Sequence, residues 1–215
     1  MIEGEVPVYE EEVQRSFNAI LEEASEFFMQ RGRIHQSLLD LTRRLDEAGI
    51  PYAVIGAIAL SYHGLSRMTL DVDILLTPEG LAEFKARYLG CGYVPAFAGA
   101  QKTFRAADSG VRIEVVTAGE YPGDGLPKAV SFPHPADASL EAGGVRVITL
   151  ERLVELKLAS GMTAPHRLRD LSDVQDLIRT LRLPETFSDG LDPSVRSVFQ
   201  RLWQTAQGPD RVQEG

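Results

Sequence analysis

The 215-residue chain has one cysteine, four histidines and no long apolar run. A single cysteine excludes an internal disulfide and any cysteine-rich metal cluster, and it fits a reducing compartment. The histidines, at positions 35, 63, 134 and 166, show neither the H-E-x-x-H pattern nor another paired spacing, so zinc chemistry is not expected. The glycine signatures of dinucleotide and P-loop sites are absent, as is the G-x-S-x-G of serine hydrolases.

Acidic charge dominates the chain and is concentrated at its start. The net charge is −9, and residues 1–30 contain eight glutamates against Arg15 alone. This balance argues against a general nucleic-acid coat, while the near-neutral remainder leaves room for a local basic groove. The cations available for such a groove are Arg146, Arg152, Lys157, Arg167 and Arg169. Because no apolar run approaches membrane-spanning length and the first residues are acidic where a signal peptide is basic, we expect a cytoplasmic protein.

Two aspartates one residue apart, Asp71 and Asp73, open a β-prone apolar run, Asp71-Val72-Asp73-Ile74-Leu75-Leu76. Residues i and i+2 of a strand project to the same face, so the two carboxylates stand side by side. They repel one another and lose solvation, and the pair therefore needs a cation. Oxygen ligands at this spacing suit Mg²⁺. A bare D-x-D is more often a solvated turn or a helix cap, and only its context favours a metal site.

That context begins upstream of the aspartates. Residues 51–55 are apolar and β-branched and predict a strand, which stops at Gly56. A glycine there lets backbone approach a ligand closely. Residues 57–62 have helical composition and are followed by His63 and Gly64. The start of a short helix is thus expected near the aspartates, where free N–H groups would meet phosphate oxygens.

A third carboxylate lies on a neighbouring predicted strand. Residues 111–116 alternate so that Arg112, Glu114 and Val116 share one face. Taken alone, Glu114 is more simply a solvent-facing strand residue. Taken with Asp71 and Asp73, it supplies the third oxygen ligand that a two-metal phosphoryl-transfer site needs.

Together these motifs resemble those of the DNA polymerase β-like nucleotidyltransferase superfamily. Gly56-Ala57, thirteen residues and then Asp71-Val72-Asp73 are similar to its signature of a glycine with Ser or Gly, a spacer and D-h-[DE]. The surrounding sequence is similar to the small prokaryotic branch, which includes toxin-type nucleotidyltransferases of the AbiEii/MenA kind. The resemblance spans roughly residues 34–180. Ala57 departs from the pattern because it lacks a hydroxyl, and Glu114 stands where Asp is commoner.

The resemblance implies a two-metal transfer of a nucleotide. Two Mg²⁺ ions would be held by Asp71, Asp73 and Glu114, and an acceptor hydroxyl would attack the α-phosphorus of an NTP with release of pyrophosphate. The amides of Gly56 and Ala57 would cradle the triphosphate. Developing charge would be neutralised by Arg67, ahead of Lys102 and Arg112, although each of the three is by default an ordinary surface cation.

The sequence leaves the acceptor and the partners open. A tRNA end fits the toxin-type branch, whereas a protein side chain or a small molecule fits the acidic balance better. One rival is a nucleotide-binding or regulatory module without catalysis, for which Ala57 is the main argument. Another is an interaction protein that uses its acidic N-terminal helix to bind an antitoxin or a second copy of itself.

A lysine and two aspartates in the second half of the chain form a further candidate group. Lys157 lies in an apolar helix, where its ammonium must either extend to solvent or meet a phosphate. The resemblance favours contact with phosphate or sugar. Asp170 and Asp173 are three residues apart and share a helix face. We expect them to cap that helix or to pair with Arg167 and Arg169.

The element pattern predicts an α/β (α+β) fold, in which a mixed sheet is flanked by helices. Three segments are expected: an acidic helical extension over 1–33, the nucleotidyltransferase domain over 34–183, and a C-terminal helix with a flexible tail over 184–215. The expected helices cover 34–48, 57–62, 78–89, 150–160 with a break at Gly161, 168–181 and 193–206. The expected strands cover 51–55, 71–76, 93–97, 102–106, 111–116 and 145–148, and 121–142 is expected to be mostly loop that forms part of a substrate rim.

Overall fold

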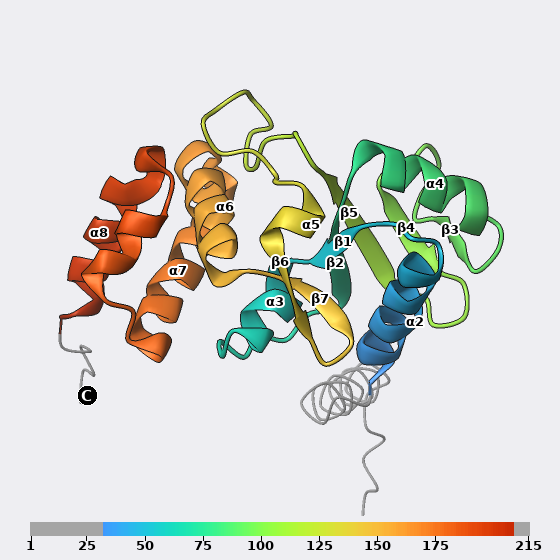
Figure 1. Cartoon of the computed structure of the whole chain (residues 1–215), viewed down its shortest axis with the longest axis horizontal. Helices are drawn as coiled ribbons and strands as arrows, with labels where there is room; N and C mark the ends of the chain where they lie inside the picture. The colour runs from blue at the N-terminus through green and yellow to red at the C-terminus, as the bar shows by residue number, and fades with distance from the viewer. Residues whose placement is uncertain (1–31, 209–215) are drawn as a thin grey trace, which may run out of the picture.

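The computed structural model describes residues 32–208 and forms a seven-stranded mixed sheet with helices around it (Figure 1). The strand order is β3-β4-β5-β2-β1-β7-β6. The strands are β1 (Tyr52–Val54), β2 (Asp71–Leu76), β3 (Tyr93–Pro95), β4 (Thr103–Ala106), β5 (Arg112–Thr117), β6 (Ser139–Ala142) and β7 (Val145–Ile148). The predicted acidic extension lies outside the described residues except for its last two positions.

Strand β2 is the centre of the sheet. It runs parallel to β5 and antiparallel to β1, and β1 in turn runs parallel to β7. Val72, Ile74 and Leu75 of β2 are at most 1% exposed, because the strand is covered on both faces beyond its first residues. The two aspartates thus lie in the first half of a strand whose other half is fully buried.

The helices confirm the predicted fold class. They are α2 (Arg33–Glu47), α3 (Gly56–Tyr62), α4 (Pro78–Tyr88), α5 (Pro135–Ala138), α6 (Leu150–Thr163), α7 (Leu168–Leu181) and α8 (Pro193–Ala206). Helices α6, α7 and α8 pack on one another at one end of the molecule, and α2 and α4 lie at the other end (Figure 1). In the described part of the chain, no helix is long and apolar enough to cross a membrane.

Local sequence explains where several helices begin. The side chains of Thr77, Thr149 and Asp192 each accept a hydrogen bond from a backbone N–H in the first turn of the helix that follows. Pro78 and Pro193 occupy the first helical position, where the missing N–H costs nothing. The bounds of α7 and α8 agree with those predicted from periodicity.

Of two predictions about local structure, one is confirmed and one is wrong. The segment 121–142 is mostly loop, as predicted, and it ends in the short helix α5 and edge strand β6, whose residues 139–142 pair with β7. Gly161 does not break its helix but lies inside α6. A Cβ at Gly161 would lie 2.6 Å from Cγ of Leu171, so this glycine allows α6 and α7 to pack closely.

Candidate functional site

The three predicted carboxylates lie together where β2 and β5 run side by side. In the register, Asp73 is opposite Glu114 and Asp71 is opposite Arg112. Residues opposite one another in adjacent strands project to the same face, and so do i and i+2. All four side chains therefore share one face, with Asp71, Glu114 and Arg112 between 36% and 41% exposed.

Gly56 allows Asp73 to adopt its position. The backbone of Gly56 has φ +65°, which disfavours any other residue. A Cβ at this position would overlap Oδ2 of Asp73 and would lie 2.7 Å from its Cγ. The N–H of Ile55 also donates to the carbonyl of Asp73 at 3.0 Å, which fixes the two strands against one another. Gly56 is therefore required both by its own conformation and by the aspartate that packs on it.

The charge on Asp73 is only partly compensated. Burial raises the pKa of its carboxyl to about 6, and the nearby charges of Glu114 and Asp71 act in the same direction. Lys157 and Arg167 oppose this rise in the pKa, so both cations lie within electrostatic range of Asp73. Because the environment of Asp73 disfavours its charged form, a cation bound beside this carboxylate would be stabilising.

Arg112 is the cation closest to the carboxylates in this structure. Its guanidinium forms an ion pair with Glu114, and Nη1 lies 3.9 Å from Oδ2 of Asp71. Across residues 32–208, no three acidic, histidine or cysteine side chains converge closely enough to hold a metal as they stand. Glu114, the predicted third ligand, is held by arginine instead. The pattern R-x-E on one strand face carries this signal in the sequence.

The donor set nevertheless fits a hard divalent cation. Three carboxylates share one face of two adjacent strands, and the pKa of Asp73 is raised partly by the other two. Carboxylate oxygen is the ligand that Mg²⁺ prefers. Glu114 would need to leave Arg112 to complete such a site.

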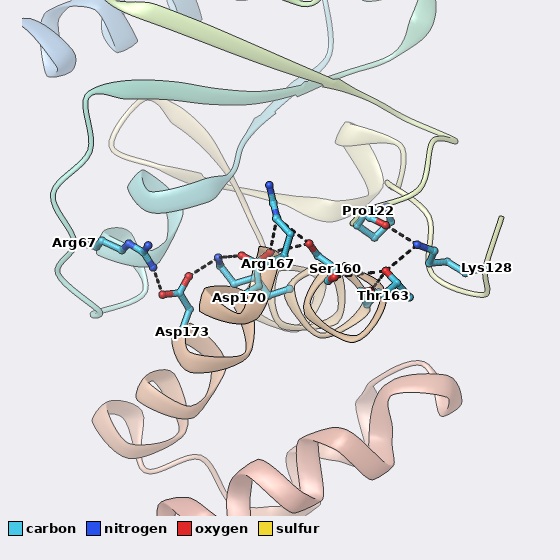
Figure 2. A network of polar contacts seen from close by, with 10 residues as sticks. Arg67, Pro122, Lys128, Ser160, Thr163, Arg167, Asp170 and Asp173 are labelled. Carbon is cyan, nitrogen blue, oxygen red and sulfur yellow. Dashed lines mark hydrogen bonds and ion pairs between the residues drawn. The ribbon is translucent and has the colours of Figure 1, made fainter. Parts of the chain in front are cut away.

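A second charged group, which we call the ion-pair network, links the loop before β2 to helices α6 and α7 (Figure 2). Nζ of Lys157 lies 2.7 Å from Asp173 and 3.0 Å from Asp170. Asp173 also pairs with Arg67, and Asp170 accepts a hydrogen bond of 2.9 Å from Nε of Arg167. Three cations thus share two buried aspartates.

Lys157 lies in the middle of the ion-pair network. The side chain of Lys157 is 11% exposed and neither reaches solvent nor lies free for a phosphate, because two carboxylates bind it. Burial by itself would raise the pKa of Asp170, but Lys157, Ser160 and Arg167 hold it below its ordinary value. As predicted, Asp170 pairs with Arg167.

The remaining predicted residues occupy separate places. Arg67 forms an ion pair with Asp173 and makes no hydrogen bond or ion pair with the carboxylates of β2 and β5. Ala57 is the second residue of α3 and is partly exposed. Lys102 pairs with the exposed Glu120. The pair of Arg67 and Asp173 spans 106 positions of sequence and gives no local signal.

The loop predicted to form a substrate rim is attached to α6 beside the ion-pair network. Nζ of Lys128 donates to the carbonyl of Pro122 at 2.6 Å and to Oγ1 of Thr163 at 3.1 Å (Figure 2). Gly123 has φ +77°, and a Cβ there would lie 2.8 Å from the carbonyl of Ser160. The loop is therefore held in close contact with the same turn of α6 that carries Ser160.

No protein-family model and no curated protein matches the chain. Among solved structures, a nucleotidyltransferase-like protein of Paracoccidioides brasiliensis is 16% identical, with a TM-score of 0.49 over 79% of this chain and 87% of that chain. The structure of ANT(2″)-Ia with adenylyl-2″-tobramycin is 14% identical, with a TM-score of 0.44 over 76% and 92%. The Thermotoga maritima CCA-adding enzyme complexed with tRNA is 17% identical, with a TM-score of 0.38 over 80% and 42%.

A likeness at this level concerns the fold, so the function has to be derived from the site itself. The toxin-type branch stays a prediction.

Proposed function

We propose that the chain is a metal-dependent nucleotidyltransferase that moves an NMP from an NTP to an acceptor hydroxyl and releases pyrophosphate. One observation carries this proposal: a group with excess negative charge and a group with excess positive charge lie within electrostatic range of one another, since Lys157 and Arg167 both act on Asp73. Three carboxylates on β2 and β5 face one arginine, and three cations in the ion-pair network face two aspartates. The first group attracts a divalent cation and the second attracts an anion. A metal–triphosphate complex contains both.

The carboxylates have a defined role in this proposal. Asp71 and Asp73 hold Mg²⁺, and Glu114 completes the ligand set after its ion pair with Arg112 opens. When bound, Mg²⁺ supplies stabilisation of the charge that develops on the phosphate and lowers the pKa of the attacking hydroxyl. Gly56 keeps Asp73 close to the start of α3.

The other predicted residues orient the nucleotide. The amides of Gly56 and Ala57 contribute hydrogen bonds to the phosphates. Arg67 acts through Asp173, which it helps to fix against Lys157. The acceptor is a tRNA end if the chain belongs to the toxin-type branch, and otherwise a protein side chain or a small molecule.

A second candidate function is a nucleotide-binding module without catalysis. The ion pair of Arg112 with Glu114 favours it, because that contact occupies the predicted third ligand. Ala57 favours it as well, since a methyl group replaces a hydroxyl. Such a module binds NTP without releasing pyrophosphate.

The test is transfer of label from each of the four α-labelled NTPs with Mg²⁺, in the presence of total tRNA or cell extract. The comparison is the double variant Asp71→Asn/Asp73→Asn, with Glu47→Gln/Glu83→Gln, two exposed glutamates of α2 and α4, as a charge-matched control. We expect a labelled product with the wild type and the control, and none with the double variant. Metal-dependent NTP binding without transfer supports the module, and the absence of both overturns the nucleotide site.

A further inference from the structure

Arg167 differs from the other cations of the ion-pair network in how it is held. It ends the short 3₁₀ turn (Pro165–Arg167) between α6 and α7. Its Nε donates to Oδ2 of Asp170 at 2.9 Å and to Oγ of Ser160 at 3.1 Å, while Ser160 Oγ itself lies 2.7 Å from Asp170. Both hydrogen bonds thus fix the guanidinium at its base.

The outer edge of that guanidinium is accessible. The Arg167 side chain is 53% exposed, against 19% for Arg67 and 11% for Lys157. Over residues 32–208, Ser160 and Asp170 are its only hydrogen-bonding partners. In Figure 2 the side chain stands out from the turn, away from Asp173 and Arg67.

The charges of the network point to the same residue. Two aspartates balance two cations, and Lys157 is bound to both aspartates while Arg67 is bound to Asp173. The network as a whole therefore has one positive charge in excess, and Arg167 is its most exposed cation. Its effect on Asp73 places it within electrostatic range of the carboxylates.

From this geometry we infer that Arg167 binds a phosphate group of the nucleotide, and that Lys157, whose ammonium is already bound, does not. The inference rests on the proposed function and names a binding residue for it. A guanidinium anchored through Nε presents its two outer nitrogens as a fixed pair of donors, which matches the oxygens of a phosphate. Because the anchoring contacts exist before binding, little side-chain entropy is lost when the phosphate arrives.

The experiment measures binding by calorimetry, with Mg²⁺ and inorganic triphosphate as one probe and Mg²⁺ and the transferred NTP as the other. The variants are Arg167→Met and Arg167→Lys. Arg169→Met is the matched control, since it removes the same charge from an exposed residue two positions along. We expect Arg167→Met to weaken the binding of both probes at least tenfold and Arg167→Lys to weaken it less. The affinity of Arg169→Met should stay within about twofold of the wild type.

The outcomes separate this inference from the proposed function. Wild-type binding that Arg167→Met leaves unchanged overturns the role of Arg167 and keeps the nucleotide site. A wild type that binds neither probe overturns both. The melting temperature of Arg167→Met is measured alongside, and we expect it to stay near that of Arg169→Met, because the side chain is exposed.

Discussion

Two regions of the molecule combine aspartates with cations: the carboxylates of β2 and β5, and the ion-pair network of α6 and α7. The pKa values of their buried aspartates are shifted in opposite directions. In the network, buried Asp170 has a lowered pKa because cations and a hydroxyl surround it. In the sheet, Asp73 has a raised pKa because burial and two other carboxylates act on it. One group is stabilised by the fold itself, and the other is stabilised only when a cation is added from outside.

The difference shows which part of the site is structural. The network joins the loop before β2 to two helices, so it fixes their relative positions whether or not a ligand is bound. The carboxylate group is held in place by strand register and by Gly56, and its charges are poorly matched. Removing a charge from each region is therefore expected to have opposite effects on the stability of the protein without metal.

The largest effect on stability is expected for Asp173→Asn. This change leaves Arg67 and Lys157 with a neutral partner in a buried position, and loss of one member of a buried ion pair costs about 3–5 kcal/mol. Urea unfolding followed by circular dichroism measures it. An unchanged midpoint would contradict the view that the network holds the helices in place.

Gly56→Ala is expected to destabilise by about 2–4 kcal/mol, because it combines a positive φ with a clash against Asp73. The matched control is Gly49→Ala, which has φ +67° but no atom within 4 Å of the added Cβ, and it should cost only about 1 kcal/mol. Equal melting temperatures for the two variants would show that Asp73 does not pack on Gly56 as described.

The pH dependence of stability should have opposite signs in the two regions. The raised pKa of Asp73 means that the folded protein keeps a proton that the unfolded chain has lost. Its contribution therefore makes the metal-free protein less stable as the pH rises from about 4 to 6. The lowered pKa of Asp170 contributes stability above its unfolded pKa, and this is lost as the pH falls below about 4.

Urea titrations between pH 3 and 8 on the wild type, Asp73→Asn and Asp170→Asn separate these contributions. In the wild type, the free energy of unfolding should decrease by about 1–3 kcal/mol between pH 4 and 6, and this decrease should be absent in Asp73→Asn. The same slope in that variant and the wild type would show that another group titrates in this range.

The smallest effect is expected for Asp71→Asn in the absence of metal. Relief of repulsion around a carboxylate that is 36% exposed should change stability by about 0.5 kcal/mol or less, in the stabilising direction. The same variant should lose most of the rise in melting temperature that Mg²⁺ or Mn²⁺ gives the wild type. A substantial destabilisation without metal would place Asp71 in the structural group instead.

Local sequence predicted much of the fold and part of the site. The D-x-D run, its strand and Gly56 follow from period-two alternation and from the conformational freedom of glycine. The neighbouring strand with Glu114 follows from the same alternation. These features depend on residues close together in the chain, so one sequence carries them.

What the sequence did not predict depends on contacts between distant segments. The pairing of Arg67 with Asp173 joins residues 106 positions apart, and the ion pairs of Lys157 with Asp170 and Asp173 likewise join α6 to α7. Gly161 looked like a helix end but is a packing contact with Leu171. The exposure that singles out Arg167 goes with its place in the turn between α6 and α7.

The most direct test of the account is a crystal structure with Mn²⁺ and a non-hydrolysable NTP. We expect metal density between Asp71 and Asp73, Glu114 released from Arg112, and a phosphate on the outer nitrogens of Arg167. Metal and nucleotide bound elsewhere, with the pair of Arg112 and Glu114 intact, would contradict the claim that these two groups of opposite charge form one site.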